Sequence, residues 1–240
     1  MGRYDRTCEE FAAHRLHSPP SDHGCKLCRG PLRNQSYSTC YLCGRHSEYL
    51  NGHELDYYYP VSLAFDDGQF YQDLITYKTA GASALQQQIK MDLTIVLHKS
   101  LKENKDIWLG EPRPDLVSWI PSTRRDNDSM EWITRKVYKT ATALLRATGQ
   151  EVKRREPDLS RFEVLDDVDG CSVMLLDDLF TSGSHLFSAA GILKEAGAQR
   201  VGAVTLGRFV RAEESPDFKR QAQSRPFSWR WSSLESDWLF

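Results

Sequence analysis

The stretch "VMLLDDLFTSGSHL", residues 173–186, constrains the fold more than any other part of the chain. Four apolar residues have the length of a short buried strand, and they lead directly into Asp177 and Asp178. A small polar loop follows, and the apolar spacing after it predicts a helix over 184–196. A second apolar run occupies residues 200–206. A strand, a helix and another apolar strand in this order predict a parallel sheet covered by helices, which is an α/β fold.

The elements expected elsewhere agree with this fold class. Aromatic and apolar residues predict a strand over 56–65, and a short strand over 115–120 should stop at Pro121. The charged stretch 150–170 is expected to be a loop, with at most a short strand near 162–165. Apolar residues at helical spacing predict further helices over 69–79, 83–104 and 128–149.

The chain divides into four segments. Residues 1–20 are polar, end in Ser-Pro-Pro and are expected to form a flexible tail. Residues 21–50 contain most of the cysteines, and residues 51–211 contain the alternating strands and helices. Residues 212–240 are polar but carry several large aromatic side chains, so this tail should pack back on the domain or on a partner. With 240 residues, 40% of them hydrophobic, the chain can bury a substantial core.

Four cysteines form two closely spaced pairs, Cys25-x-x-Cys28 and Cys40-x-x-Cys43. Two such pairs can supply four thiolates to a tetrahedral Zn²⁺, so we expect a zinc ribbon over residues 21–50. A segment this short cannot hold its own hydrophobic core, and the metal would supply its folding energy. The alternatives are a redox-active pair or free thiols.

Charge and hydropathy exclude several classes of function. The formal net charge of −2 does not suggest general nucleic-acid binding. No apolar run reaches the ~20 residues that a membrane-spanning helix needs. The first residues have no apolar core of the kind that a secretory signal carries. We therefore expect a cytoplasmic protein that does not contact membranes.

The acidic pair and the loop after it suggest a ligand with two kinds of polar group. In an open parallel sheet, ligands bind beyond the carboxyl ends of the strands. Carboxylates accept hydrogen bonds from hydroxyl groups or bind a metal ion, whereas residues 181–184 offer hydroxyl and backbone donors at a helix N-terminus to a phosphate. A ribose 5-phosphate satisfies both. The alternatives are that Asp178 caps a turn while Asp177 is merely exposed, or that the pair belongs to a receiver-type acidic pocket.

At this point the sequence resembles a known family. "VMLLDDLFTSGSH" is similar to the thirteen-residue signature of type I phosphoribosyltransferases, which bind phosphoribosyl pyrophosphate (PRPP). Phe180 is bulkier than is usual there, and His185 stands where a small hydroxyl residue is common. Together with the two cysteine pairs, the signature resembles the ComF-like phosphoribosyltransferases, which are associated with competence and DNA uptake. "LITYKTAG" and "PDLVSWIPSTRR" are similar to two further segments of that family, and the resemblance covers roughly residues 24–210.

The resemblance implies a fold, a reaction and a set of site residues. The fold would be a type I phosphoribosyltransferase-like sheet with a small N-terminal zinc ribbon. Such a protein binds PRPP with Mg²⁺ and transfers the phosphoribosyl group to an acceptor, here unidentified, with release of pyrophosphate. Asp177 and Asp178 would contact the ribose hydroxyls, partly through Mg²⁺. The implied PRPP-binding residues are Asp177, Asp178, Leu179, Thr181, Ser182, Gly183 and Ser184, and the implied pyrophosphate loop contains Ser122, Thr123 and Arg124.

The middle of the chain departs from the family pattern and keeps a second hypothesis open. "RRDNDSMEW" stands in place of an Arg-Gly-Phe-Asn type motif, and "KRREPDLSRFEVL" is a short remnant of a Gln-containing loop. The alternative to transfer is a protein that senses PRPP or a nucleotide, or serves DNA uptake, while its zinc ribbon contacts protein or DNA. A homodimer is left open. Lys78 and residues 153–155 could reach phosphates, with solvated surface charges as the alternative.

Overall fold

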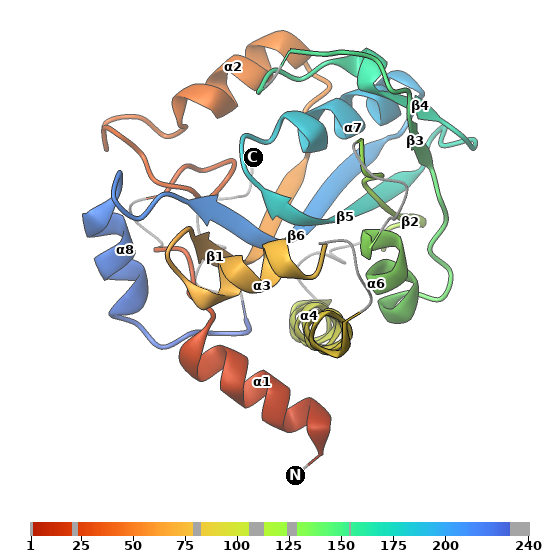
Figure 1. Cartoon of the computed structure of the whole chain (residues 1–240). Helices are drawn as coiled ribbons and strands as arrows, with labels where there is room; N and C mark the ends of the chain where they lie inside the picture. Colours follow the sequence, from red (N-terminus) through yellow and green to blue (C-terminus); the bar gives the residue numbers. More distant parts are fainter. Residues whose placement is uncertain are drawn as a thin grey trace.

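The protein is built around a parallel sheet of four strands in the order β1-β6-β5-β2 (Figure 1). The computed structural model describes residues 2–20, 24–78, 83–105, 113–123, 129–153 and 155–230. The strands of this sheet are β1 (Tyr57–Phe65), β2 (Leu116–Trp119), β5 (Ser172–Phe180) and β6 (Arg200–Val210). All neighbouring pairs in it are parallel, which confirms the predicted fold class of a parallel α/β sheet flanked by helices.

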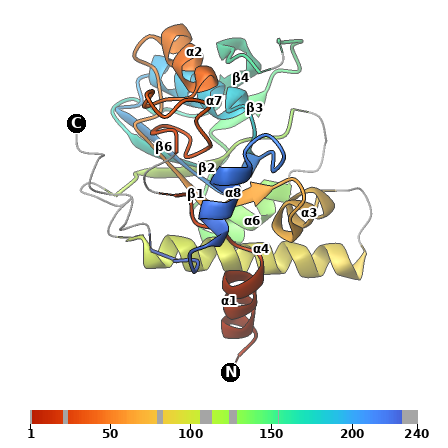
Figure 2. The same cartoon turned by 90° about the vertical axis from the view of Figure 1, so that its left-hand side faces the viewer.

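Helices cover both faces of the sheet, so the structure has three layers (Figures 1 and 2). One face carries α3 (Gln69–Thr76), α4 (Ala84–Glu103) and α6 (Ser129–Val137). The other face carries α2 (Tyr41–Leu50) and α7 (Ser184–Glu195). On the α7 side lies a small antiparallel pair, β3 (Leu145–Ala147) and β4 (Phe162–Val164), and the 3-10 turn η1 (Leu159–Arg161) comes directly before β4. Helix α8 (Pro216–Gln223) packs Phe218 and Ala222 over the ends of β1 and β6.

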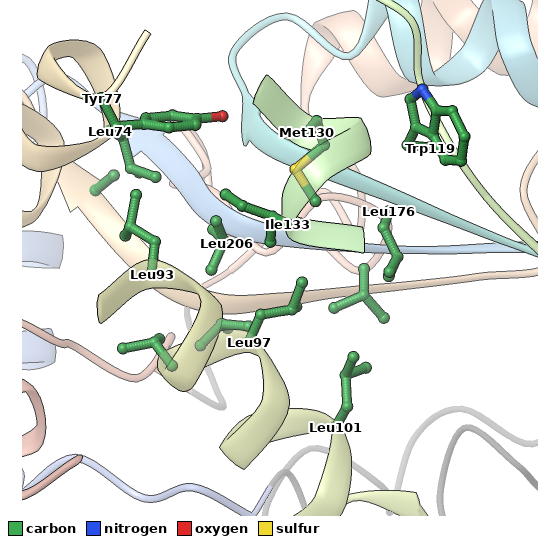
Figure 3. Packing of buried hydrophobic residues seen from close by; sticks show 14 of the residues in the cluster. Leu74, Tyr77, Leu93, Leu97, Leu101, Trp119, Met130, Ile133, Leu176 and Leu206 are labelled. Carbon is green, nitrogen blue, oxygen red and sulfur yellow. The ribbon is translucent and has the colours of Figure 1, made fainter. Parts of the chain in front are cut away.

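The layer between the sheet and α4 is a continuous apolar core (Figure 3). Leu93 and Leu97 on α4 are fully buried and meet Leu176 of β5 and Leu206 of β6. A spacing of four residues places the two helix leucines on one face of α4, as the sequence predicted. Burial of each such leucine stabilises the fold by roughly 1.5–3 kcal/mol.

The opposite core contains the cysteine module. Cys25, Cys28 and Cys43 are buried in one apolar cluster with Val173 and Leu175 of β5. The module has one isolated β-bridge, and its second cysteine pair leads into helix α2. The cysteine segment therefore packs on the sheet as part of the main core.

Three neighbouring strands, β1, β6 and β5, change face together at one row of the sheet. Met174 and Leu176 face α4, and strict alternation would place Phe180 on that face too, yet Phe180 lies in the cysteine-side core. The regular ladder between β5 and β6 is interrupted at Asp178 and Leu206, and the ladder between β6 and β1 is interrupted at Leu206 and Val61. This row, Val61–Leu206–Asp178, is called the shift row below. Such an irregularity re-aims the side chains beyond it.

The expected flexible tail over residues 1–20 is wrong for most of its length. Residues Arg3–His14 form helix α1, which packs against α4 on the side away from the sheet (Figure 2). Phe11 is 1% exposed and its ring meets Phe70 edge to face at 6.4 Å. The Arg15 guanidinium donates to Asp73 of α3 at 2.8 Å. One aromatic residue and one ion pair thus fix a segment whose composition is mostly polar.

The helix expected over 128–149 ends at Val137, and Leu145 instead begins strand β3. The Thr142 amide donates to the Val117 carbonyl at 3.1 Å, and the Leu144 amide donates to Ser118 Oγ at 3.1 Å. The apolar residues after α6 are therefore buried by an extended chain that runs along β2. The apolar residues of this segment are spaced as in a helix, but they are buried while the chain is extended. The β-branched threonines in the segment favour the extended conformation.

The C-terminal tail packs back on the domain as far as the structure describes it. Phe227 and Trp229 pack against the core that contains α4, and the side chain of Asn104, at the C-terminal end of α4, donates to the Trp229 carbonyl at 2.5 Å. The remaining large side chains of the tail lie beyond Arg230, outside the described residues. None of the described helices has the length and apolar character needed to cross a bilayer.

Candidate functional site

The candidate site lies at the carboxyl ends of β5 and β2, which are neighbours in the sheet. Trp119, the last residue of β2, pairs with Leu176 of β5, and the acidic pair follows at once on β5. Two loops leave this edge side by side: residues 120–123 after β2, and residues 181–183 between β5 and α7. The carboxyl edge of a parallel sheet is where ligands of such folds bind.

Asp178 is held by the end of helix α3. It is 6% exposed, and its carboxylate accepts a hydrogen bond from the Tyr77 hydroxyl. The Lys78 ammonium lies 2.5 Å from the same carboxylate oxygen. These partners come from "LITYKTAG", which is similar to a Tyr-Lys-x-x-Gly segment of the ComF-like family. The role of Tyr77 was not predicted, although that motif was the signal that could have found it.

Asp177 faces a different environment. It is half-buried, and its Oδ1 accepts a hydrogen bond from the Asp178 amide at 2.8 Å. Its charge acts on Tyr58, whose pKa is raised mainly by complete burial on the cysteine side of the sheet. The two carboxylates therefore lean toward opposite layers, with Asp178 toward α3 and Asp177 toward Tyr58.

The loop after the acids turns through Gly183 into helix α7. Gly183 has φ +84°, a left-handed conformation that favours glycine. A Cβ at this position would lie 2.4 Å from the Phe180 ring. Ser182 and Ser184 hydroxyls are 3.1 Å apart, and the exposed Thr181 completes the set of donors. The loop presents hydroxyl groups at a helix N-terminus, an arrangement suited to an anion.

The loop after β2 is joined to the first turn of α7. Thr123 Oγ1 and His185 Nε2 lie 3.1 Å apart, within hydrogen-bonding distance. His185, which departs from the family signature, thus contacts the loop expected to bind pyrophosphate. Ser122 is exposed beside it. Arg124, the third expected residue of that loop, lies outside the described residues.

The four cysteines of the two pairs form a compact cluster. Their sulfur atoms all lie within 4.8 Å of one another, and Cys28 Sγ is 3.8 Å from Cys40 Sγ. Tetrahedral coordination with Zn–S bonds of ~2.3 Å separates sulfur atoms by about 3.8 Å. The pKa of the Cys28 thiol is lowered well below its usual value by hydrogen bonds from the other cysteines, and Arg208 adds to the effect. The cluster could hold a metal ion such as zinc.

Arg208 lies between the cysteine cluster and the strand end, and it was not predicted. It is buried at the end of β6, where it contacts the Cys28 thiol and the Phe180 carbonyl. Burial lowers the pKa of Arg208, but Cys28, Tyr58 and Cys43 together more than offset this, so the pKa is raised. A single charged residue within the apolar run "VGAVTLGRFV" was the sequence signal for it.

The tyrosines of β1 and the charged residue Lys153 have partners within the protein. Tyr58 donates to or accepts from Thr205 at 2.7 Å inside the core, and Tyr57 and Tyr59 pack against the α4 side. Burial raises the pKa of Tyr57 to about 12. Lys153 is largely exposed and lies 3.6 Å from Glu156, as a solvated surface pair would. Arg154, its neighbour, lies outside the described residues.

The arrangement offers carboxylates, a cation and hydroxyl donors within one strand edge, with a potential metal centre behind it. No protein-family model matches this chain, and no curated protein matches it either. The functional assignment therefore depends on the residues and their geometry.

Proposed function

We propose that this protein binds PRPP together with Mg²⁺ and transfers its phosphoribosyl group to a nucleophilic acceptor, as a phosphoribosyltransferase of the glycosyltransferase class. The observation that carries the proposal is the order of groups along one chain segment: two acids, a loop of hydroxyl residues with one glycine, and a helix N-terminus. This segment leaves the carboxyl end of a central parallel strand. The resemblance of "VMLLDDLFTSGSH" to the type I signature supports the same ligand.

Each part of PRPP has a suitable group nearby. The ribose hydroxyls would donate to Asp177 and Asp178, and the 5-phosphate would accept from residues 181–184. The pyrophosphate would lie toward Ser122 and Thr123, on the neighbouring strand end. Lys78 supplies a positive charge at the same edge, close to Asp178.

The reaction breaks the bond between ribose C1 and the pyrophosphate oxygen, and forms a bond between C1 and the acceptor. Positive charge develops on the ring as the pyrophosphate leaves, so carboxylates beside the ribose stabilise that state. Mg²⁺ would neutralise part of the negative charge on the departing group. Asp177 and Asp178 would thus orient the ring and oppose the charge that develops on it.

The cysteine cluster is proposed to hold Zn²⁺ in a structural role. Four thiolates are the donor set of closed structural zinc sites, which leave no position for a substrate. Three of these cysteines are buried in the core that packs against β5. Bound metal would therefore stabilise the strand that carries the two acids of the candidate site.

The binding test is calorimetric titration of the metal-loaded protein with PRPP and Mg²⁺. The double variant Asp177→Asn with Asp178→Asn should lose at least about 100-fold in affinity, since each lost charge-assisted hydrogen bond costs about 1.5–3 kcal/mol. The chain offers a matched control, Asp166→Asn with Asp167→Asn, an adjacent and exposed acidic pair. Unchanged binding in the first variant would refute the site assignment.

Transfer is tested separately by pyrophosphate release from PRPP in the presence of a panel of bases and amines. Release that depends on one acceptor, and that the acidic-pair variant abolishes, supports the transferase. Tight PRPP binding without release across the panel would instead favour a sensor that binds PRPP without reaction.

A further inference from the structure

Arg208 occupies an unusual position for a charged residue. Its side chain is 8% exposed, and it follows the apolar segment of β6 that forms the middle of the sheet. Beyond the shift row, the face of β6 is reversed, which directs Arg208 to the cysteine side although Val204 and Leu206 face α4. The sheet irregularity is therefore what brings this guanidinium to the cysteine cluster.

One guanidinium bonds to both the cysteine cluster and the loop of the candidate site. Arg208 Nε donates to the Cys28 carbonyl at 3.1 Å, and Nη2 donates to the Cys28 sulfur at 3.3 Å. Nη1 donates to the carbonyls of Phe180 and Thr181 at 3.2 and 3.1 Å. Because the guanidinium is planar and rigid, these contacts connect Cys28 directly to residues 180–181.

The charge balance around Arg208 depends on the cysteines. A buried guanidinium is stable only beside an anion or a full set of acceptors. Within the part of the chain that the structure describes, no carboxylate pairs with it, and its side-chain partner is the sulfur of Cys28. Four thiolates around a divalent cation would leave a net negative charge, which is opposite in sign to the buried guanidinium and would attract it.

The packing leaves little room for the guanidinium to shift. The Phe180 ring lies 4.8 Å beneath it, and a Cβ at Gly30 would lie only 2.5 Å from Nη2. Gly30 closes the first cysteine knuckle, so the absence of a side chain there keeps the path from Arg208 to Cys28 open.

We propose that Arg208 is a positioning residue that couples metal occupancy of the cysteine centre to the conformation of residues 180–184. With metal bound, the thiolate and the carbonyls hold one guanidinium geometry, and the loop is ordered for phosphate. Without metal, the cysteine side of this link is lost and the loop loosens. The ligand of the loop rests on the proposed function, but the coupling itself does not.

The test compares metal-loaded and chelated protein by hydrogen exchange of peptides that span residues 178–187. Chelation should speed exchange of these amides, and weaken PRPP binding, by about tenfold, within the range typical of coupling between sites. Gly30→Ala should produce much of the same change while metal is still bound, because it displaces Arg208 without altering a cysteine. Gly44→Ala is the matched control, since its new Cβ would meet its nearest neighbour, Thr39 Oγ1, at an ordinary 3.9 Å.

Arg208→Met removes the link outright, and Arg200→Met, at the other end of the same strand, controls for the substitution. Metal content is measured for every variant. In Arg208→Met, chelation should no longer change loop exchange, and Arg208→Lys should restore part of the coupling. If Arg208→Met does not fold, Gly30→Ala and Arg208→Lys still decide the question.

The proposal is refuted if metal-loaded Gly30→Ala protects the loop as well as wild type does, or if chelation affects the loop equally with and without Arg208. Failure of the proposed function gives a different result. In that case wild type does not bind PRPP, while the exchange of residues 178–187 still depends on metal and on Arg208.

Discussion

Replacement of Gly183 by alanine gives the sharpest test of the loop geometry. The position has φ +84°, where an L-residue costs about 1–2 kcal/mol. The new Cβ would lie 2.4 Å from the Phe180 ring. That ring is packed against Tyr58 at 4.9 Å and beneath Arg208 at 4.8 Å, so its displacement adds about 1–3 kcal/mol of overpacking. Gly183→Ala should therefore destabilise the fold by roughly 2–5 kcal/mol.

The assay is chemical denaturation of the metal-loaded protein, with Gly149→Ala as the matched control. Gly149 has φ +75°, and among the described residues no atom lies within 4 Å of a Cβ built there. This control should lose only the conformational term of about 1–2 kcal/mol. In a Phe180→Leu background the excess cost of Gly183→Ala should disappear, which a double-mutant cycle measures. Equal losses for the two glycines, or an unchanged excess without the Phe180 ring, would refute the steric argument.

Two further outcomes are expected. Cys28→Ser should abolish stoichiometric metal binding in native mass spectrometry and lower the free energy of unfolding by more than ~5 kcal/mol. The control Cys171→Ser should change neither quantity. Wild-type protein that carries no metal after expression with zinc would contradict this prediction. Burial and Lys219 lower the pKa of His17, so the unfolded chain binds more protons and stability should fall as the pH drops below about 6.5. His17→Gln should flatten that part of the pH–stability curve relative to the exposed control His14→Gln, and an unaltered curve would argue against the assignment.

Secondary structure was predicted correctly from the sequence where the local pattern of residues is compatible with only one kind of element. The strand 57–65 and the helix 184–195 have continuous apolar runs or clear start and stop residues, and both lie where expected. The cysteine spacing likewise predicted the cluster. Burial of aliphatic residues, by contrast, did not specify a helix over 138–149, because an extended chain along β2 buries them equally well. Local pattern is a weak guide where tertiary contacts decide.

The contacts of the site were harder to predict than its location. The edge at Asp177 and Asp178 followed from strand order alone. The opposite leaning of the two acids follows from ordinary alternation, because Asp177 and Asp178 are successive residues of one strand. The direction of Phe180 beyond them depends instead on the shift row, which involves three strands and leaves no mark in the sequence of any one of them. Arg208 shows the same limit, because its partners are Cys28, 180 residues away, and Phe180, 28 residues away.

The shift row also limits how this protein can change length in evolution. Because β1, β6 and β5 reverse their faces at the same level, an insertion or deletion in one strand beyond the row would put that strand out of step with the other two. A one-residue deletion on β5 there would turn Phe180 toward α4 and separate its carbonyl from Arg208. We therefore expect length variation among homologues to fall in the loops outside residues 57–65, 172–180 and 200–210, whereas these three strand ends keep a common length.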